Sequence, residues 1–272
     1  MFLKLDNLRL NILVPDGGYR DFSDLVLIKS EDGGTLLGNY LILKAYHNEK
    51  ENEFIGQPAV ANLVWKYYSP SVANAAYEGK ENSINLLPGF ISPGIAYYTG
   101  MPDEELYGRV GWVLAHEMSH GFDYKNSQMD AYGLGNSIFD GDDLDNYMNI
   151  VDQVVSYFNT MEPFPGVFMN GEMVKGEASA DLIGIQLVLR AAKDKSEFDY
   201  ETLFKSCMEV FRRVYPTAEM ELSAMLTDVH PPQYLRSNAS MQMNDELYEV
   251  YEIHEGDGMY LPDEERIRFW GE

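Results

Sequence analysis

Two histidines and a glutamate lie close together in one apolar stretch, residues 110–123. His116 and His120 are four residues apart, so on an α-helix both imidazoles lie on one face and can bind one metal ion. Glu117 is rotated by about 100° from His116 and can reach the same point from the side. This HExxH spacing is typical of a zinc site in which the histidines bind the metal and the glutamate acts as general base.

The alternative to a zinc site is a chance match or a structural pair of histidines, because short motifs also occur by coincidence. The surroundings favour the metal. The stretch is apolar on most sides, so we expect a buried helix, and buried imidazoles and carboxylates are costly unless they have partners. The apolar residues are Val110, Trp112, Val113, Leu114, Ala115 and Met118.

Composition indicates a globular chain and excludes one class of partner. The 272 residues, 45% of them hydrophobic, suffice for one large domain or two small ones. The formal charge of −24 would repel phosphates, which excludes nucleic acid as a partner. We interpret this charge as a solvated surface, with a preference for cationic substrates as the alternative. Cys207 is the single cysteine, so no intrachain disulfide and no cysteine metal site is expected.

The sequence carries no signal-peptide pattern and no apolar run of membrane-spanning length. We therefore expect no membrane segment in this chain. The compartment stays open between the cytoplasm and the cell surface or exterior.

Periodicity predicts a mainly helical chain with a small sheet. Residues 1–32 have the pattern of extended segments separated by turns, one of them at 15–18. Residues 70–88 contain two short apolar segments around a polar turn and predict a hairpin at a sheet edge, where a peptide could add as another strand. A purely structural hairpin is the alternative. Helices are expected over 35–55 (amphipathic), from 102 through the HExxH motif, and over 144–161, 171–193, 200–214, 218–226 and 245–251.

A catalytic zinc needs a third protein ligand and an open position. Glu177 is a candidate because it lies in the mostly apolar helix expected over 171–193; a solvated carboxylate on the outer face is the alternative. Histidine ligands usually donate their second N–H to a carboxylate, which makes Asp181 and Asp123 candidates. Asp123 could equally be an ordinary residue of the loop after the helix.

Separate blocks of the sequence resemble the signature segments of the neprilysin family of zinc endopeptidases. That family includes the endothelin-converting enzymes and bacterial oligopeptidase O. The blocks are Asn-Ala-Ala-Tyr at 74–77 with Leu-Pro-Gly at 87–89, and residues 116–123, 171–181 and 228–238. Residues 256–270 also resemble the family's C-terminus.

The resemblance implies a thermolysin-like gluzincin catalytic lobe, an α+β fold that is mainly α, in a single domain over residues 1–272. It also implies an endopeptidase that cleaves small to medium peptides. The implied site holds one Zn²⁺ ion per chain on His116, His120 and Glu177, with Asp123 and Asp181 orienting the histidines. The other implied roles are Glu117 as general base, His230 as oxyanion donor, Arg236 as carbonyl partner, and Asn74 and Ala75 as contacts of the substrate backbone.

Departures from the family pattern refine these expectations. Ala178, Ser179 and Ile183 replace the commoner Asn-Ile and Gly, and the cysteine near the C-terminus of extracellular animal members is absent, which indicates a bacterial type. Family members are much longer, and their N-terminal lobe, which covers the active-site cavity, is the expected intramolecular partner in the parent protein. Two alternatives follow: a zinc-containing peptide-binding lobe with weak or no activity, and an aminopeptidase of the wider zincin group.

Overall fold

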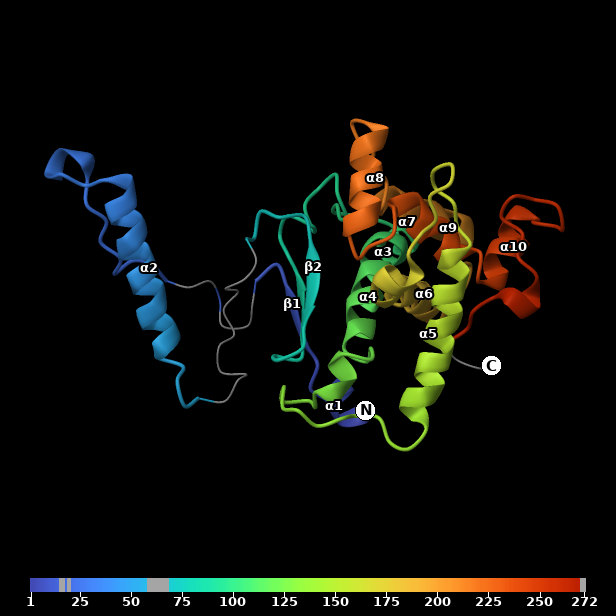
Figure 1. Cartoon of the computed structure of the whole chain (residues 1–272), viewed down its shortest axis with the longest axis horizontal. Coiled ribbons are helices and arrows are strands. Elements are labelled where there is room, and N and C mark those ends of the chain that lie inside the picture. Colours follow the sequence, from blue (N-terminus) through green and yellow to red (C-terminus); the bar gives the residue numbers. More distant parts are fainter. Residues whose placement is uncertain (15–17, 19–20, 58–68, 270–272) are drawn as a thin grey trace.

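The computed structural model describes residues 1–14, 18, 21–57 and 69–269. It is mainly helical with one small sheet, as predicted, and the sheet lies beside a cluster of helices (Figure 1). Within this described part, no helix combines the length and the apolar composition needed to cross a bilayer.

The N-terminal part forms α1 (Phe2–Asp6), β1 (Arg9–Ile12) and α2 (Leu36–Asn52). The prediction of extended segments was wrong for α1, where Lys4 finds interior carbonyl partners that a sequence pattern does not reveal. Apart from Gly18, the turn expected at 15–18 lies outside the described residues. The helix expected over 35–55 is confirmed, and its Thr35 side chain caps the N-terminus by accepting from the Gly38 N–H.

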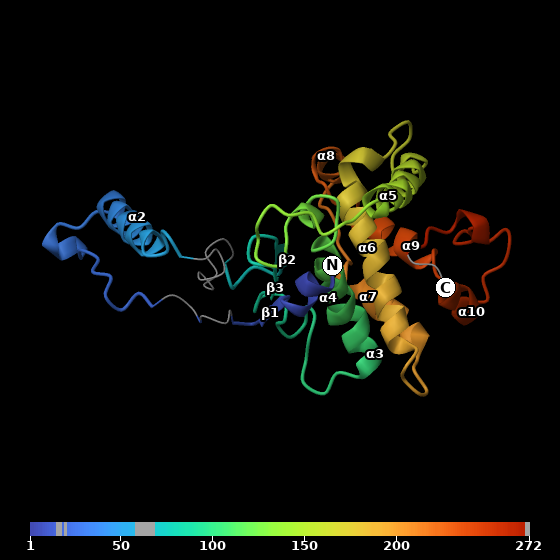
Figure 2. The same ribbon diagram turned by 90° about the horizontal axis from the view of Figure 1, so that it is seen from below.

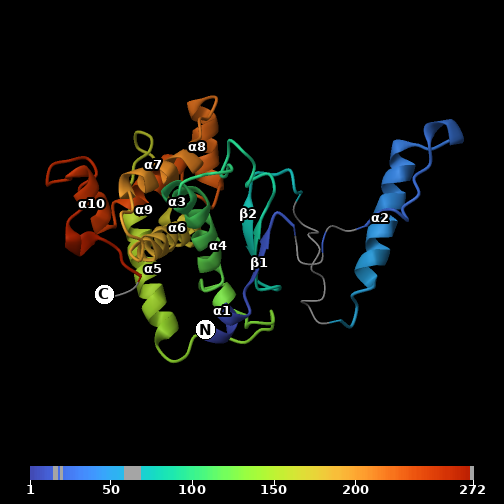
Figure 3. The same cartoon turned by 180° about the vertical axis from the view of Figure 1, so that it is seen from behind.

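Helix α2 lies apart from the other elements, as the view from behind also shows (Figure 3). None of its residues is buried, so the apolar side of the predicted amphipathic helix is exposed. The exposed large side chains are Leu36, Leu37, Tyr40 and Leu41.

The sheet confirms the hairpin expected over 70–88. Strand β2 (Ala75–Glu78) pairs antiparallel with β3 (Ser83–Leu86), and β3 pairs parallel with β1. The order is β1-β3-β2, so β3 is central and fully buried while β2 is an edge strand. Asn82, with a φ of 47°, takes the left-handed conformation that closes the turn.

The helix that carries the HExxH motif begins at Asp103, close to the predicted start. It comprises α3 (Asp103–Leu106), a π-helical turn (Tyr107–Gly111) and α4 (Trp112–His120). A Cβ on Gly108 in the π turn would lie 2.6 Å from the Leu203 carbonyl oxygen, so this glycine permits close approach of the neighbouring helix α7 (Tyr200–Val210).

The other helices are α5 (Asp143–Asn159), α6 (Gly171–Ala192), α8 (Ala218–Thr227), α9 (Gln233–Met241) and α10 (Asp245–Tyr251). The helices expected over 144–161, 171–193, 218–226 and 245–251 are confirmed to within two residues. Helix α7 ends at Val210, four residues earlier than expected. Helix α9 was not predicted, since two prolines precede it and the first turn begins directly after Pro232.

Helix α6 runs through the middle of the helical cluster (Figure 2). One side of it packs in a buried cluster with α5 and α9 that includes Val154, Phe158 and Leu182. The other side packs with α4 and α7, where Trp112 and Phe204 are fully buried. Because both sides of α6 are held, side chains on it have a fixed position relative to α4.

Candidate metal centre

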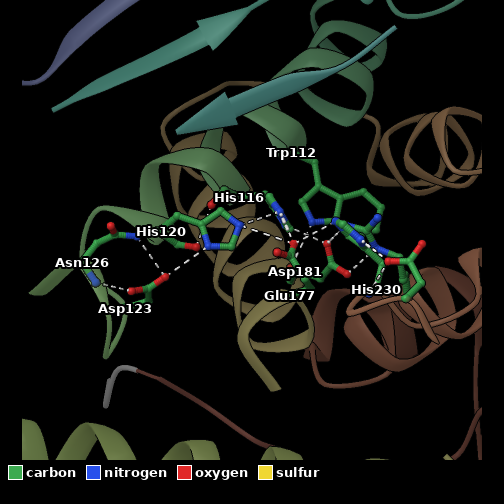
Figure 4. Close-up of polar contacts among 11 residues, drawn as sticks. Trp112, His116, His120, Asp123, Asn126, Glu177, Asp181 and His230 are labelled. Carbon is green, nitrogen blue, oxygen red and sulfur yellow. Dashed lines mark hydrogen bonds and ion pairs between the residues drawn. The ribbon is translucent and has the colours of Figure 1, made fainter. Parts of the chain in front are cut away.

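Three candidate ligand atoms converge between α4 and α6 (Figure 4). Nε2 of His116 lies 3.1 Å from Nε2 of His120 and 3.2 Å from Oε2 of Glu177, and the third side of the triangle is 3.4 Å. Ligands of a tetrahedral zinc, bound at 2.0–2.1 Å, are separated by about 3.3 Å. The two nitrogens and one carboxylate oxygen therefore fit a zinc ion in both spacing and chemistry.

Each histidine is oriented by a carboxylate on its other ring nitrogen. Nδ1 of His116 lies 2.8 Å from Oδ1 of Asp181, and Nδ1 of His120 lies 3.4 Å from Oδ2 of Asp123. Such contacts select the tautomer that leaves Nε2 free for a metal. Both carboxylates are buried, so both candidates from the sequence are in contact with the histidines they were expected to orient.

Asp181 also holds Arg236. Its two carboxylate oxygens accept from Nε and Nη2 of Arg236 at 2.7 and 2.8 Å, a bidentate pair inside the protein. Burial alone would raise the pKa of the Asp181 carboxyl, but Arg236 and His116 outweigh burial and lower it to about 2. The Trp112 indole N–H donates to the Asp181 carbonyl at 3.0 Å, which ties α4 to α6.

The charges of the triangle favour anionic Glu177 beside the imidazoles. Burial raises the pKa of the Glu177 carboxyl, but His116, His120 and His230 outweigh it and hold that pKa far below its usual range. Burial likewise opposes protonation of His120, whereas Asp123 and Glu177 raise its pKa to about 10. This concentration of strongly coupled groups at one point is typical of functional sites.

Glu177 is half-buried rather than solvated, so the alternative of an outward-facing carboxylate is wrong. It lines a cavity of about 670 Å³ together with the general-base candidate Glu117. Asn74, Ala75 and the other expected substrate contacts line the same cavity. The cavity is also lined by apolar side chains, among them Phe90, Val113, Val210 and Phe211, which belong to one hydrophobic cluster.

His230 contacts Glu177 directly, with Nε2 3.2 Å from the same Oε2 that lies beside His116 and His120. Its Nδ1 lies 2.8 Å from Oδ1 of Asp228, and its backbone N–H donates to the same oxygen at 2.9 Å. No role was predicted for Asp228 from the sequence. The signal was present, because Asp228 lies two residues before His230 in the same block and a short Asx turn fixes both.

The structure brings the predicted site residues together at one cavity, with Asp181 buried behind His116. The roles expected for Glu117, His230, Arg236, Asn74 and Ala75 stay predictions. Two neighbours that were not predicted from the sequence also contribute: Asn126, which donates to Asp123, and Phe211, whose ring centroid lies 4.4 Å from Cζ of Arg236. In the C-terminal block, Trp270 lies outside the described residues.

Comparison with known proteins tests the family resemblance directly. The sequence profile of Peptidase family M13 matches residues 74–267, which include every predicted site residue. The chain belongs to this family. The expected membership of the neprilysin family is thereby confirmed.

This M13 chain is 30% identical over 232 residues to the neutral endopeptidase of Lactococcus lactis subsp. lactis (strain IL1403). The match covers 84% of the chain but 35% of that relative, so the chain spans about a third of its length. Neprilysin-11 of Caenorhabditis elegans is 32% identical over 128 residues. That match covers 45% of this chain and 14% of the nematode protein. Similarity to bacterial neutral endopeptidases also confirms the expected bacterial type.

Two solved structures confirm the fold. PepO from Lactobacillus rhamnosis HN001 matches with a TM-score of 0.82 and 25% identity, covering 99% of this chain and 42% of that one. The zinc metalloprotease Zmp1 of Mycobacterium tuberculosis, solved with an inhibitor, has the same coverage, a TM-score of 0.83 and 22% identity.

Proposed function

We propose that this chain is the catalytic lobe of a zinc-dependent endopeptidase that hydrolyses peptide bonds in small to medium peptides. The observation that carries the proposal is the triangle of His116, His120 and Glu177, which lines one cavity together with Glu117. Three protein ligands with one open position form the usual catalytic zinc site.

Glu117 is the proposed general base. Zinc on the three ligands would polarise the scissile carbonyl and bring the pKa of a water close to neutrality. Glu117 accepts the proton of that water and later donates it to the leaving amine. With 8% of its surface exposed, Glu117 is shielded from bulk solvent on most sides, which strengthens its interaction with charge that develops in the cavity.

His230 and Arg236 are the proposed partners of the reacting carbonyls. Nε2 of His230 pairs with Oε2 of Glu177, and it would become free to donate to the developing oxyanion when Glu177 binds zinc, while Asp228 holds the ring through Nδ1. Asp181 fixes Arg236 through Nε and Nη2. Nη1, which has no hydrogen-bond partner among the described residues, is thus left to donate to a substrate carbonyl.

The peptide is proposed to lie along the edge strand β2. Asn74 and Ala75 line the cavity, and an extended peptide can add to such an edge through main-chain hydrogen bonds. The apolar lining residues Phe90, Val113 and Phe211 suit an apolar side chain next to the scissile bond.

The first experiment measures zinc per chain by elemental mass spectrometry, together with cleavage of an internally quenched peptide. Glu117→Gln should retain about one zinc and lose about 10²–10⁴-fold in kcat, the range for general-base catalysis. Glu249→Gln, an identical change on the exposed surface of α10, should match the wild type. Near-normal cleavage by Glu117→Gln would exclude Glu117 as the base, and a folded chain that takes up no zinc would exclude the whole site.

A second candidate function is a zinc-containing peptide-binding lobe with weak or no activity. It is favoured by the short span, 35% of the Lactococcus relative, and by the exposed apolar residues of α2, which a second lobe would cover. If the wild type holds zinc and binds peptide without cleavage, the N-terminal lobe of a relative is added in trans. Cleavage on addition would identify an incomplete catalytic lobe, and continued inactivity would favour the binding module.

An N-terminally blocked peptide then distinguishes an endopeptidase from an aminopeptidase of the wider zincin group. The endopeptidase should still cut it. An aminopeptidase should not, because it needs the free amine.

A further inference from the structure

Lys4 on α1 is buried where a lysine is not expected. It is 1% exposed, whereas its apolar neighbours Phe2, Leu3 and Leu5 are 79%, 57% and 44% exposed. A buried ammonium is unfavourable unless its donors find partners, so the contacts of Lys4 must compensate for its burial.

Those contacts join three separate elements. Nζ of Lys4 donates to the carbonyl oxygens of Asn126 and Met129 at 2.7 and 2.9 Å, both in the loop that follows α4. The backbone carbonyl of Lys4 accepts from the side chain of Asn82 in the β2–β3 turn at 2.8 Å. Nζ also lies 5.8 Å from the centroid of the Tyr77 ring on β2. Lys4 therefore bridges α1, the hairpin and the loop after α4.

The same loop holds the carboxylate that orients His120. Oδ1 of Asp123 accepts from the backbone N–H groups of Asn126 and Lys125 at 2.6 and 2.8 Å. Oδ2 of Asp123 contacts the Asn126 amide at 3.3 Å and Nδ1 of His120 at 3.4 Å, a chain of contacts drawn in Figure 4. Asn126 belongs to both sets of contacts: its backbone carbonyl accepts from Lys4, and its backbone and side-chain N–H groups donate to Asp123.

Space around Asn126 is tight as well. A Cβ on Gly79 in the hairpin turn would lie 2.4 Å from the Asn126 side-chain oxygen. The loop is therefore held between the hairpin on one side and the Lys4 ammonium on another. Without the ammonium, the half-buried Met129 carbonyl loses the donor that Lys4 supplies, and the Asn126 carbonyl keeps only the backbone N–H of Met129 at 3.0 Å. The loop then loses its direct hydrogen bonds to α1.

We propose that Lys4 is a positioning residue of the metal centre, which fixes the loop over 123–129 so that Asp123 holds His120 in the metal-binding orientation. The proposal rests on the zinc site proposed above. It assigns Lys4 no contact with substrate or metal, and its influence passes through Asn126 and Asp123.

The test compares Lys4→Met with Lys44→Met, the same substitution on an exposed lysine of α2. Zinc release to a chromophoric chelator is followed with time, and thermal melting is recorded with and without zinc. Partners one layer outside the ligands usually contribute 10–100-fold to metal affinity, so we expect Lys4→Met, one layer further out, to release zinc about tenfold faster. Its melting temperature should also rise less on zinc addition, while Lys44→Met behaves as the wild type.

A double-mutant cycle separates positioning from a purely structural role. In an Asp123→Asn background, Lys4→Met should accelerate zinc release little further, because the pathway from Lys4 to His120 is already broken. An additive effect, or zinc release unchanged by Lys4→Met in a folded protein, would overturn the proposal. Since Lys4→Met could fail to fold, Lys4→Gln is measured in parallel. Its amide nitrogen lies one bond nearer the backbone than Nζ and carries no charge, so a folded Lys4→Gln should also release zinc faster, and unchanged release would overturn the proposal. Failure of the wild type itself to bind zinc would instead refute the proposed function.

Discussion

Replacing Asp181 by asparagine tests the central polar contact of the site, because this carboxylate serves both His116 and Arg236. Asparagine keeps the shape of the aspartate side chain but removes its charge. One of the two oxygens that accept from Arg236 is replaced by an NH₂ group, which can only donate. Loss of a carboxylate partner of a metal-bound histidine typically costs 10–100-fold in metal affinity, about 1.4–2.7 kcal/mol. Burial raises the pKa of the Asp181 carboxyl, but Arg236 and His116 lower it to about 2, so both partners lose a favourable charge when the carboxylate is replaced.

A second cost should appear in folding. Arg236 is 8% exposed, and removing one partner of a buried pair destabilises by about 3–5 kcal/mol because the other charge stays uncompensated. Zinc affinity is measured by chelator competition, and the free energy of unfolding of the metal-free protein by urea titration, with Asp152→Asn on the exposed surface of α5 as control. Zinc affinity within twofold of the wild type, together with lower stability, would refute the orienting role and leave Asp181 as a partner of Arg236 alone.

Three further perturbations follow from the same structure. Gly184→Ala would place a Cβ 2.9 Å from the Trp112 ring and push α4 away from α6. We expect the free energy of unfolding, measured by urea titration, to fall by about 1–3 kcal/mol and zinc to bind more weakly. Unchanged stability would contradict this close packing. Asp228→Asn should lower kcat and leave KM unchanged. The loss in kcat should be smaller than the loss of about 100-fold expected when the His230 donor itself is removed. A change in KM alone would make His230 a residue that binds the substrate in its ground state. Burial lowers the pKa of Lys4 to about 8, against the attraction of Asp123 and Asp130, so the unfolded chain binds more protons between pH 8 and 10.5. The wild type should therefore gain stability relative to Lys4→Met as the pH rises through this window, by at most about 3 kcal/mol, and a flat difference in unfolding free energy would contradict the buried charge.

Local patterns predicted the parts of this site that lie within one helix. His116 and His120 share a face because of the α-helical repeat, and apolar periodicity located α5 and α6 to within two residues. The ligand role of Glu177 could not be decided in this way. Its spacing is equally consistent with a solvated face, and its distance to His120 depends on how α6 packs against α4, so the family resemblance was needed to assign it.

Long-range contacts account for most of what the sequence did not predict. Lys4 lies more than a hundred residues from Asn126, and a lysine in a short N-terminal segment has the pattern of a surface residue. Asp228 was missed although its contact with His230 is local, two residues apart in one Asx turn. Helix α9 and the π turn were missed for local reasons, since prolines obscured the former and the latter leaves the apolar pattern almost unchanged.

The π turn at Tyr107–Gly111 also bears on how the chain tolerates changes of length. A π turn accommodates one residue more than the α-helix it interrupts, so the helix on its N-terminal side is rotated by about 100° relative to an uninterrupted α-helix. Downstream, Trp112 anchors the helix to α6 through its hydrogen bond to Asp181. An insertion or deletion within the π turn would therefore rotate α3. The segment that carries His116 and His120 is anchored by Trp112 and would keep its orientation. A change of chain length at this point would thus leave the positions of the two histidine ligands unchanged.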